Sequence, residues 1–269
     1  MTGDFFSVRD EVVLITGASG QLGVSYQKAF LERGAFVVGL DIVESSEINN
    51  LRGLYEETYM YITADVTSRA SLQSALNNVV SVFGRPTVLI NNAAIDSPPN
   101  APAAETGPFE TYPEESWDKV LDVNLKGTFL ACQVFGSAMA AGSKGSVINV
   151  ASIYGMVSPD QSIYDYRRVK GEAFYKPVAY SVSKSGILNL TRYLAVYWAK
   201  HNVRVNTLTI AGVLNGQDEE FLEAYSSRIP IGRMASSDQY DASLIFLASN
   251  ASAYMTGSNL IVDGGWTAI

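Results

Sequence analysis

Residues 12–23 read VVLITGASGQLG: four apolar residues, a threonine, and then glycines at positions 17, 20 and 23. Four consecutive apolar residues predict a strand that is buried on both faces of a sheet. A helix ended by Gly34 is expected next, and a second apolar run, residues 36–40, leads into Asp41. This order predicts a strand–turn–helix–strand unit of the kind that binds dinucleotides.

Each glycine has a physical use in such a turn. Gly17 permits a tight turn, Gly20 lets the backbone approach a diphosphate, and Gly23 lets helix and strand pack closely. The N-terminus of the helix then offers free N–H groups and the positive end of its dipole to phosphate groups. The alternative is an ordinary strand-to-helix turn that binds no ligand.

Asp41 indicates which dinucleotide would bind. A carboxylate at the end of the second strand can accept hydrogen bonds from the ribose hydroxyls of NAD, and it would repel the 2′-phosphate of NADP. The glycine turn contains no arginine or lysine, and the residues after Asp41 are Ile42, Val43 and Glu44. The sequence therefore predicts NAD rather than NADP.

Apolar runs and helical patterns alternate through the rest of the chain, which predicts an α/β fold: a doubly wound parallel sheet with helices on both faces, in one domain over residues 1–269. Further strands are expected at 59–64, 88–90, 147–150, 203–208 and 260–262, and further helices at 68–83, 114–141, 180–198, 215–228 and 238–249. Residues 96–113 are expected to form a loop, because Pro98, Pro99, Pro102, Pro108 and Pro113 fall within it.

Composition excludes several classes of function. The 269 residues carry a net charge of −8 without a basic block, so nucleic acid is an unexpected partner. One cysteine, Cys132, excludes an internal disulfide, and a single histidine, His201, argues against a histidine-based metal site. The N-terminus lacks a signal-peptide pattern, and no apolar run is long enough to span a bilayer. We therefore expect a cytoplasmic protein with no metal and no membrane partner.

Tyr180 and Lys184 are four residues apart, so a helix would place both on one face. An ammonium beside the phenol would lower the tyrosine pKa towards neutrality, and Ser152 could hold a substrate oxygen nearby. The three side chains could then move a proton on and off oxygen while a hydride moves at carbon. Taken alone, the Tyr-x-x-x-Lys spacing is also common on amphipathic helices.

Three polar positions have two interpretations each. Asp65 could receive the adenine amino group or cap the helix expected near Ser68. Asn92, with the small residues after it, could leave room for a cofactor and tie the strand end to its neighbours. Asn124, inside a helical pattern, could be structural or could hold a water in a proton path to Lys184.

Together these residues resemble the short-chain dehydrogenase/reductases over roughly residues 8–266. The matching motifs are Thr16-Gly17…Gly20…Gly23, Asp65, Asn91-Asn92-Ala93, Asn124, Ser152, Tyr180-x-x-x-Lys184, Val203-Arg204-Val205-Asn206 and Val262-Asp263-Gly264-Gly265. The resemblance implies a Rossmann sheet of about seven strands, a nicotinamide cofactor, and a homotetramer or dimer built through the helices after Asn124 and around residues 180–200.

The resemblance also implies roles for individual residues. Tyr180 is expected to be the general acid/base, Lys184 to lower its pKa and bind the nicotinamide ribose, Ser152 to orient the substrate, and Asn124 to complete the proton relay. The cofactor is expected against Gly17, Ser19, Gly20, Gln21, Leu22, Gly23, Asp41, Ile42, Asp65, Val66, Asn92, Ala93, Ala94, Tyr180, Lys184 and Val213.

The chain departs from the family pattern at three places. Its glycine spacing, with Gln21 at the usual middle glycine, is more typical of the longer branch, which modifies nucleotide sugars. Ile210-Ala211 stands where Pro-Gly is common, so that loop is expected to run differently. Ser152 and Tyr180 are 28 residues apart rather than about a dozen, so an insert at about residues 155–178 is expected to form a lid or pocket wall in what otherwise resembles the shorter branch.

Residues 165–176 of the insert carry four cations, Arg167, Arg168, Lys170 and Lys176, against two carboxylates, Asp165 and Glu172. This excess suggests either an anionic substrate or solvated charges on a surface loop. The Ser-Ile-Tyr-Gly run at 152–155 and the insert are similar to oxidoreductases of bacterial surface-sugar and flagellin-glycan pathways.

The sequence thus predicts an NAD(H)-dependent oxidoreductase that interconverts a secondary alcohol and a ketone on a sugar or other polar carbonyl compound. The alternatives are a nucleotide-sugar dehydratase or epimerase with tightly bound NAD, and a non-catalytic NAD-binding regulator.

Overall fold

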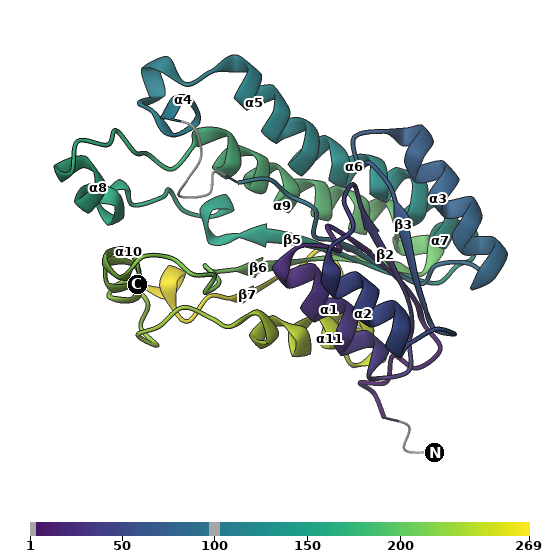
Figure 1. Ribbon diagram of the computed structural model, residues 1–269. Coiled ribbons are helices and arrows are strands. Elements are labelled where there is room, and N and C mark those ends of the chain that lie inside the picture. The colour runs from purple at the N-terminus through teal and green to yellow at the C-terminus, as the bar shows by residue number, and fades with distance from the viewer. Residues whose placement is uncertain (1–3, 97–102) are drawn as a thin grey trace.

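The computed structural model describes residues 4–96 and 103–269, shown in Figure 1. Within these residues the chain forms a seven-stranded sheet in the order β3-β2-β1-β4-β5-β6-β7. Every neighbouring pair of strands is parallel. The strands are β1 Val12–Thr16, β2 Phe36–Asp41, β3 Tyr59–Thr63, β4 Val88–Asn91, β5 Gly145–Ser152, β6 Val203–Ile210 and β7 Asn259–Val262. The predicted doubly wound α/β class is confirmed.

Helices connect the strands in sequence order. The α-helices are α1 Gln21–Leu31, α2 Ser46–Leu54, α3 Arg69–Val82, α4 Ala103–Thr106, α5 Glu114–Leu121, α6 Gly127–Ala131, α7 Ser137–Ala141, α8 Asp165–Val169, α9 Val178–Trp198, α10 Glu219–Ser226 and α11 Asp241–Ala248. Two π-helical turns, Asp122–Lys126 and Cys132–Gly136, join α5, α6 and α7 into one continuous helical stretch. None of the helices in the described ranges is long and apolar enough to cross a bilayer.

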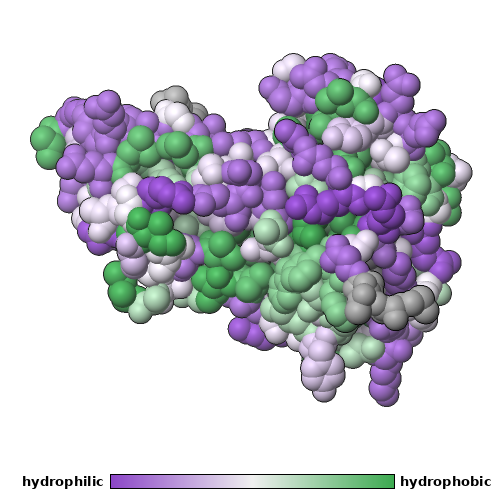
Figure 2. Space-filling view, turned by 90° about the horizontal axis from the view of Figure 1, so that it is seen from below, coloured by the Kyte–Doolittle hydropathy of each residue, from purple (hydrophilic) through white to green (hydrophobic). Residues whose placement is uncertain are grey.

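The two faces of the sheet are buried under different helices because alternate residues of each strand point to opposite sides. Leu14 and Leu89 pack with α3, α6 and α9, whereas Ile15 and Ile90 pack with α1, α2 and α11. Four consecutive apolar residues in β1 therefore fill two separate cores. Figure 2 views the layer of α1 and α11 from outside and shows apolar patches among polar side chains.

Two expectations about local structure needed correction. The expected loop at 96–113 contains two short helical turns, α4 and Phe109–Thr111; Pro98, Pro99 and Pro102 lie outside the described residues. The helix expected from residue 215 begins only at Glu219, because the Asp218 carboxylate accepts a hydrogen bond from the Phe221 N–H and caps it there.

Candidate active site

The glycine turn follows β1 and enters α1 at the carboxyl edge of the sheet. Gly17 has φ +67°, a conformation that favours glycine, and a Cβ there would lie 2.8 Å from the Ala93 Cα. A Cβ on Gly23 would lie 2.1 Å from the Gly17 carbonyl oxygen, so this position admits only glycine without rearrangement. Beside Gly20 the nearest atom to such a Cβ is 3.5 Å away. The turn is therefore tight on its protein side and open at Gly20, as an approaching diphosphate requires.

Asp41 lies at the end of β2 and shapes the same turn. Its carboxylate accepts hydrogen bonds from the backbone N–H of Ser19 (2.9 Å) and of Ile42 (2.7 Å). Each carboxylate oxygen has a further lone pair for a ribose hydroxyl. Asp41 can thus hold the turn and face a ribose at once.

A cleft of about 520 Å³ runs along this edge and brings together most of the predicted cofactor residues. Gly17, Gly20, Gln21, Leu22, Asp41, Ile42, Asp65, Val66, Asn92, Ala93, Ala94, Tyr180, Lys184 and Val213 line it. Ser19 and Gly23 do not line it, because Ser19 bonds to Asp41 and Gly23 packs against Gly17. The cleft also contains residues that the motifs did not indicate, among them Ile95, Asp96 and Asn215.

Asp65 and Asn92 secure the two strand ends in the cleft. The Asp65 carboxylate accepts from both the N–H and the hydroxyl of Thr67, while Ser68, not Asp65, caps α3. The helix-cap interpretation of Asp65 was therefore wrong. The Asn92 amide donates to the carbonyls of Thr16 and Gly17, so it ties β4 to the glycine turn as expected.

Tyr180, Lys184 and Ser152 meet where this cleft joins a second, smaller pocket. The Lys184 Nζ lies 5.9 Å from the centroid of the Tyr180 ring and donates to the Val150 carbonyl at 2.9 Å. Ser152 ends β5 and lies close enough to Tyr180 for its hydroxyl to lower the tyrosine pKa. The structure thus brings the predicted phenol, amine and hydroxyl together.

The pKa values in this geometry differ from the expectation. Desolvation raises the pKa of Tyr180 above its ordinary value, the Asp96 carboxylate raises it further, and the Ser152 hydrogen bond offsets part of the increase. Burial lowers the pKa of Lys184 from 10.5 to about 8, and Asp96 opposes that decrease. The expected lowering of the Tyr180 pKa by Lys184 is therefore wrong for this geometry, because the ammonium points at Val150 and the phenol is desolvated.

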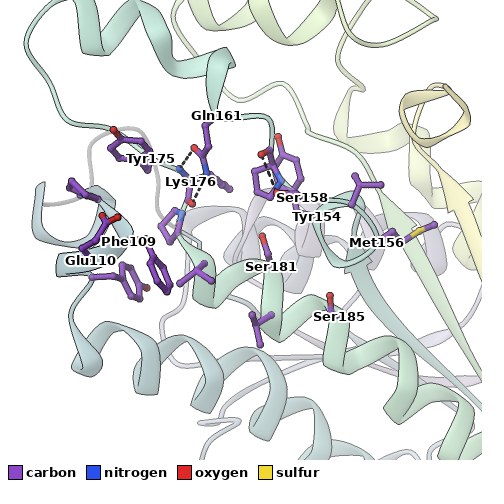
Figure 3. Close-up of a pocket in the computed structure, with 18 residues that line it drawn as sticks. Phe109, Glu110, Tyr154, Met156, Ser158, Gln161, Tyr175, Lys176, Ser181 and Ser185 are labelled. Carbon is purple, nitrogen blue, oxygen red and sulfur yellow. Dashed lines mark hydrogen bonds between the residues drawn. The ribbon is translucent and has the colours of Figure 1, made fainter.

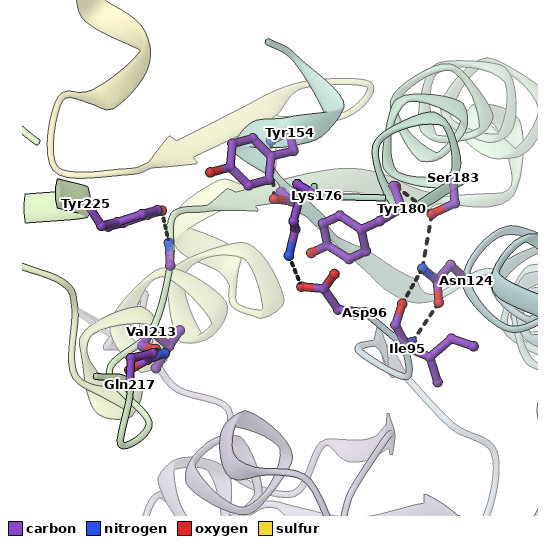
Figure 4. Close-up of polar contacts among 12 residues, drawn as sticks. Ile95, Asp96, Asn124, Tyr154, Lys176, Tyr180, Ser183, Val213, Gln217 and Tyr225 are labelled. Carbon is purple, nitrogen blue, oxygen red and sulfur yellow. Dashed lines mark hydrogen bonds and ion pairs between the residues drawn. The ribbon is translucent and has the colours of Figure 1, made fainter. Parts of the chain in front are cut away.

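Asn124 is fully buried in the π-helical turn between α5 and α6. Its amide oxygen accepts from the Ile95 N–H at 2.8 Å, and its amide nitrogen donates to the Ile95 carbonyl and to the Ser183 hydroxyl, both at 3.0 Å. The side chain therefore clamps the segment that follows β4 (Figure 4). Asn124 bonds to Ser183, the residue before Lys184, and no hydrogen bond joins Asn124 to Lys184 itself among the described contacts. The relay role of Asn124 therefore stays a prediction.

The smaller pocket has a volume of about 270 Å³ and is rich in aromatic side chains. The insert supplies one wall, in which Gln161–Tyr164 forms a 3-10 turn and α8 follows. Tyr154, Tyr164, Phe174, Tyr180, Phe221 and Tyr225 line the pocket. Ser152 and Tyr180 face it, so it is the candidate substrate site, and residues of the insert lie in one of its walls.

Each cation of the insert pairs with a carboxylate. Arg168 pairs with Asp165, Arg167 with Glu172, Lys170 with Glu220, and Lys176 with Asp96. Because Glu220 and Asp96 lie outside the insert, its local positive charge is compensated in a way that the sequence did not reveal. These pairs hold the insert to its surroundings and compensate all four cations; the anionic substrate that the charge excess suggested stays a prediction.

A larger cavity, of about 690 Å³, lies on the other side of the insert (Figure 3). It is lined mainly by apolar and aromatic residues from the turn at 107–112, the insert and the start of α9, and it shares Tyr154 and Lys176 with the substrate pocket. Tyr180, Lys184 and Ser152 do not line it. Size alone would therefore have indicated the wrong site.

Comparison with known proteins identifies the family of this chain. A family profile described as "Enoyl-(Acyl carrier protein) reductase" matches residues 17–267. The chain belongs to the short-chain dehydrogenase/reductase family, and it is an oxidoreductase that interconverts a secondary alcohol and a ketone.

Three similar proteins illustrate the family. An NAD-dependent glycerol dehydrogenase of Listeria innocua is 31% identical over 97% of this chain and 96% of its own. A D-threitol dehydrogenase of Mycolicibacterium smegmatis is 32% identical over 97% and 95%. The crystal structure of a gluconate 5-dehydrogenase from Burkholderia cenocepacia, in complex with NADP and tartrate, superposes with a TM-score of 0.85. Its sequence is 25% identical, and the superposition covers 99% of this chain and 98% of that chain.

Proposed function

We propose that this protein is an NAD-dependent dehydrogenase of a small polyhydroxylated substrate, with Tyr180 as the general acid/base. The observation that carries the proposal is the position of Tyr180, which lines both the dinucleotide cleft and the 270 Å³ pocket. A phenol at that junction can exchange a proton with a substrate hydroxyl while the neighbouring carbon faces the cofactor. General acid/base work of this kind contributes about 10²–10⁴-fold to a rate.

The residues of the cleft fit a nicotinamide dinucleotide. The glycine turn leaves the α1 N-terminus open to the diphosphate, Asp41 faces the ribose position, and Lys184 lies beside Tyr180 for the second ribose. When bound, NAD⁺ supplies the hydride acceptor and a positive charge that favours the phenolate. NAD is preferred to NADP because a 2′-phosphate would meet the Asp41 carboxylate.

The remaining chemistry belongs to this chain's own side chains. During oxidation Tyr180 accepts the hydroxyl proton, and Ser152 donates a hydrogen bond to the substrate oxygen as it becomes a carbonyl. Lys184 holds positive charge near the phenolate, and Asn124 keeps the segment after β4 in place against the cleft. Aromatic walls exclude water from the reacting carbon.

The size of the pocket favours a small substrate. Sites for drug-sized ligands measure roughly 300–1,000 Å³, so about 270 Å³ suits a polyol or a single sugar rather than a nucleotide sugar. The names of the glycerol and threitol dehydrogenases support this substrate class. Membership of a surface-sugar pathway stays a hypothesis.

We further propose one cytoplasmic domain that assembles as a homotetramer or dimer through α9 and the helices that follow Asn124, α6 and α7. Tyr193, Val196 and Tyr197 on α9 and Phe129 on α6 are 44–81% exposed, and three of them lie within five residues of one helix, as a surface covered by a partner would require. Light scattering on the purified protein would contradict the proposal if it gave a monomer mass.

A stoichiometric assay tests the function itself. Purified enzyme, NAD⁺ and a panel of four- to six-carbon polyols and sugars should produce one NADH per ketone formed. Tyr180→Phe should lower kcat at least about 10²-fold while NADH binding, followed by fluorescence, stays within about threefold. Full activity of Tyr180→Phe would refute its role, and product without net NADH would indicate an epimerase instead.

A further inference from the structure

An ion pair between Lys176 and Asp96 lies inside the substrate pocket (Figure 4). The Lys176 Nζ is 4.9 Å from the centroid of the Tyr180 ring and 5.9 Å from that of Tyr154. The Lys176 and Asp96 side chains are 9% and 40% exposed, whereas Lys170 and Glu220, another ion pair of the insert, are 56% and 51% exposed. The ammonium of this pair is therefore shielded from solvent beside Tyr180, while its carboxylate stays accessible.

The protein holds both partners in position through their backbones. The Gln161 side chain accepts from the Lys176 N–H at 2.9 Å and donates to the Lys176 carbonyl at 3.3 Å. Asp96 directly follows Ile95, whose N–H and carbonyl are both bound by Asn124. The two charged groups thus come from separate segments, and each segment is held by side-chain hydrogen bonds to its backbone.

The pair sets the charge of the pocket. Among the described residues that line it, Lys176 and Asp96 are the charged ones, and the others are aromatic, aliphatic or neutral polar. Lys184 lies on the cofactor side, with its ammonium directed at Val150. A substrate carboxylate would find the nearest cation already compensated and would meet the Asp96 carboxylate, which repels it.

We propose that the Lys176–Asp96 pair makes the enzyme specific for neutral polyols and excludes the corresponding sugar acids. Adjacent hydroxyl groups match the pair chemically, because a carboxylate accepts two O–H donors while an ammonium donates to a hydroxyl oxygen. This inference rests on the proposed function and assigns Lys176 and Asp96 as specificity-determining residues of the same site.

Matched substrates test the inference. The kcat/KM values for threitol, xylitol and sorbitol are compared with those for threonate, xylonate and gluconate, and each polyol should exceed its acid at least about tenfold, equivalent to 1.4 kcal/mol. Asp96→Asn leaves the ammonium without its carboxylate partner, so the acid-to-polyol ratio should rise at least about tenfold. Lys176→Met should lower kcat/KM for polyols and leave the acids poor.

Lys170→Met is the matched control, since it removes an exposed ion pair of the same insert and should leave the ratio unchanged. Quenching of NADH fluorescence in the enzyme–NADH complex by threitol and by threonate measures the preference without turnover. A wild-type enzyme that oxidises or binds the acids better, or an Asp96→Asn variant with an unchanged ratio, would overturn this inference alone. Absence of NADH formation with all six compounds would overturn the proposed function with it.

Discussion

Replacing Lys184 by methionine should make the cofactor-free protein more stable at neutral pH while removing its activity. The side chain is 4% exposed, and burial lowers its pKa from 10.5 to about 8. A lysine whose pKa is lowered on folding destabilises the folded protein at every pH at which it is charged in both the folded and the unfolded state. That cost is complete below about pH 8 and disappears as the pH rises towards 10.5.

The magnitude follows from the same values. The difference between 10.5 and about 8 corresponds to about 3 kcal/mol at neutral pH. Methionine has a similar length and no charge, but it loses the hydrogen bond to the Val150 carbonyl, which is worth about 1 kcal/mol. A net stabilisation of about 2 kcal/mol should raise Tm by roughly 4–8 °C for a domain of this size.

Thermal unfolding without cofactor, followed by circular dichroism at pH 7 and at about pH 10, measures the effect. At about pH 10 most of the lysine cost has gone, so the two proteins should unfold at nearly the same temperature. Lys200→Met, at an exposed lysine after α9, should change Tm by less than about 1 °C. The reasoning fails if Lys184→Met unfolds at a lower temperature at pH 7, or if its advantage does not shrink with pH.

Three further changes probe the cleft. Asp41→Asn removes the charge that opposes a 2′-phosphate, so the ratio of kcat/KM with NAD to that with NADP should fall at least about tenfold; an unchanged ratio would contradict the cofactor assignment. Gly23→Ala forces a Cβ to within 2.1 Å of the Gly17 oxygen. We therefore expect the free energy of unfolding, measured in urea, to fall by about 2–4 kcal/mol and NADH binding to be lost. Near-wild-type values would refute the clash. Because the pKa of Tyr180 is raised, this residue should give no phenolate absorbance below about pH 9 when no cofactor is added. The measurement is the difference in absorbance between the wild type and Tyr180→Phe, and a difference near neutral pH would contradict the prediction.

The sheet and the dinucleotide cleft could be predicted because each depends on short-range patterns. Apolar runs such as residues 12–15 mark strands buried on both faces, and their carboxyl ends must meet at one edge of a parallel sheet. Residues that follow those strands, such as Asp41 and Asn92, therefore lie in the cleft without any knowledge of the loops.

The substrate pocket could not be predicted in the same way. Its walls come from the insert, α10 and the segment after β4, and their relative placement depends on side-chain contacts between them. The net charge of the insert misled the interpretation because Asp96 and Glu220, distant in sequence, compensate two of its cations. The Tyr180 pKa was misjudged for a related reason, since spacing along a helix gives the distance to Lys184 but not the desolvation of the phenol.

The position of Asp96 explains why one polar pair can affect both specificity and chemistry. Burial has the largest effect on the pKa of both Tyr180 and Lys184; the Asp96 carboxylate raises that of Tyr180 further, opposes the decrease in that of Lys184, and neutralises Lys176 over the Tyr180 ring. A neutral polyol that hydrogen-bonds to Asp96 would disperse this negative charge and so favour the phenolate that oxidation requires. In the Asp96→Asn variant this negative charge is absent whether or not a polyol is bound, so the phenolate is favoured with every substrate. The preference of the variant for polyols over acids should therefore weaken, while its rate of polyol oxidation at low pH should not fall below that of the wild type.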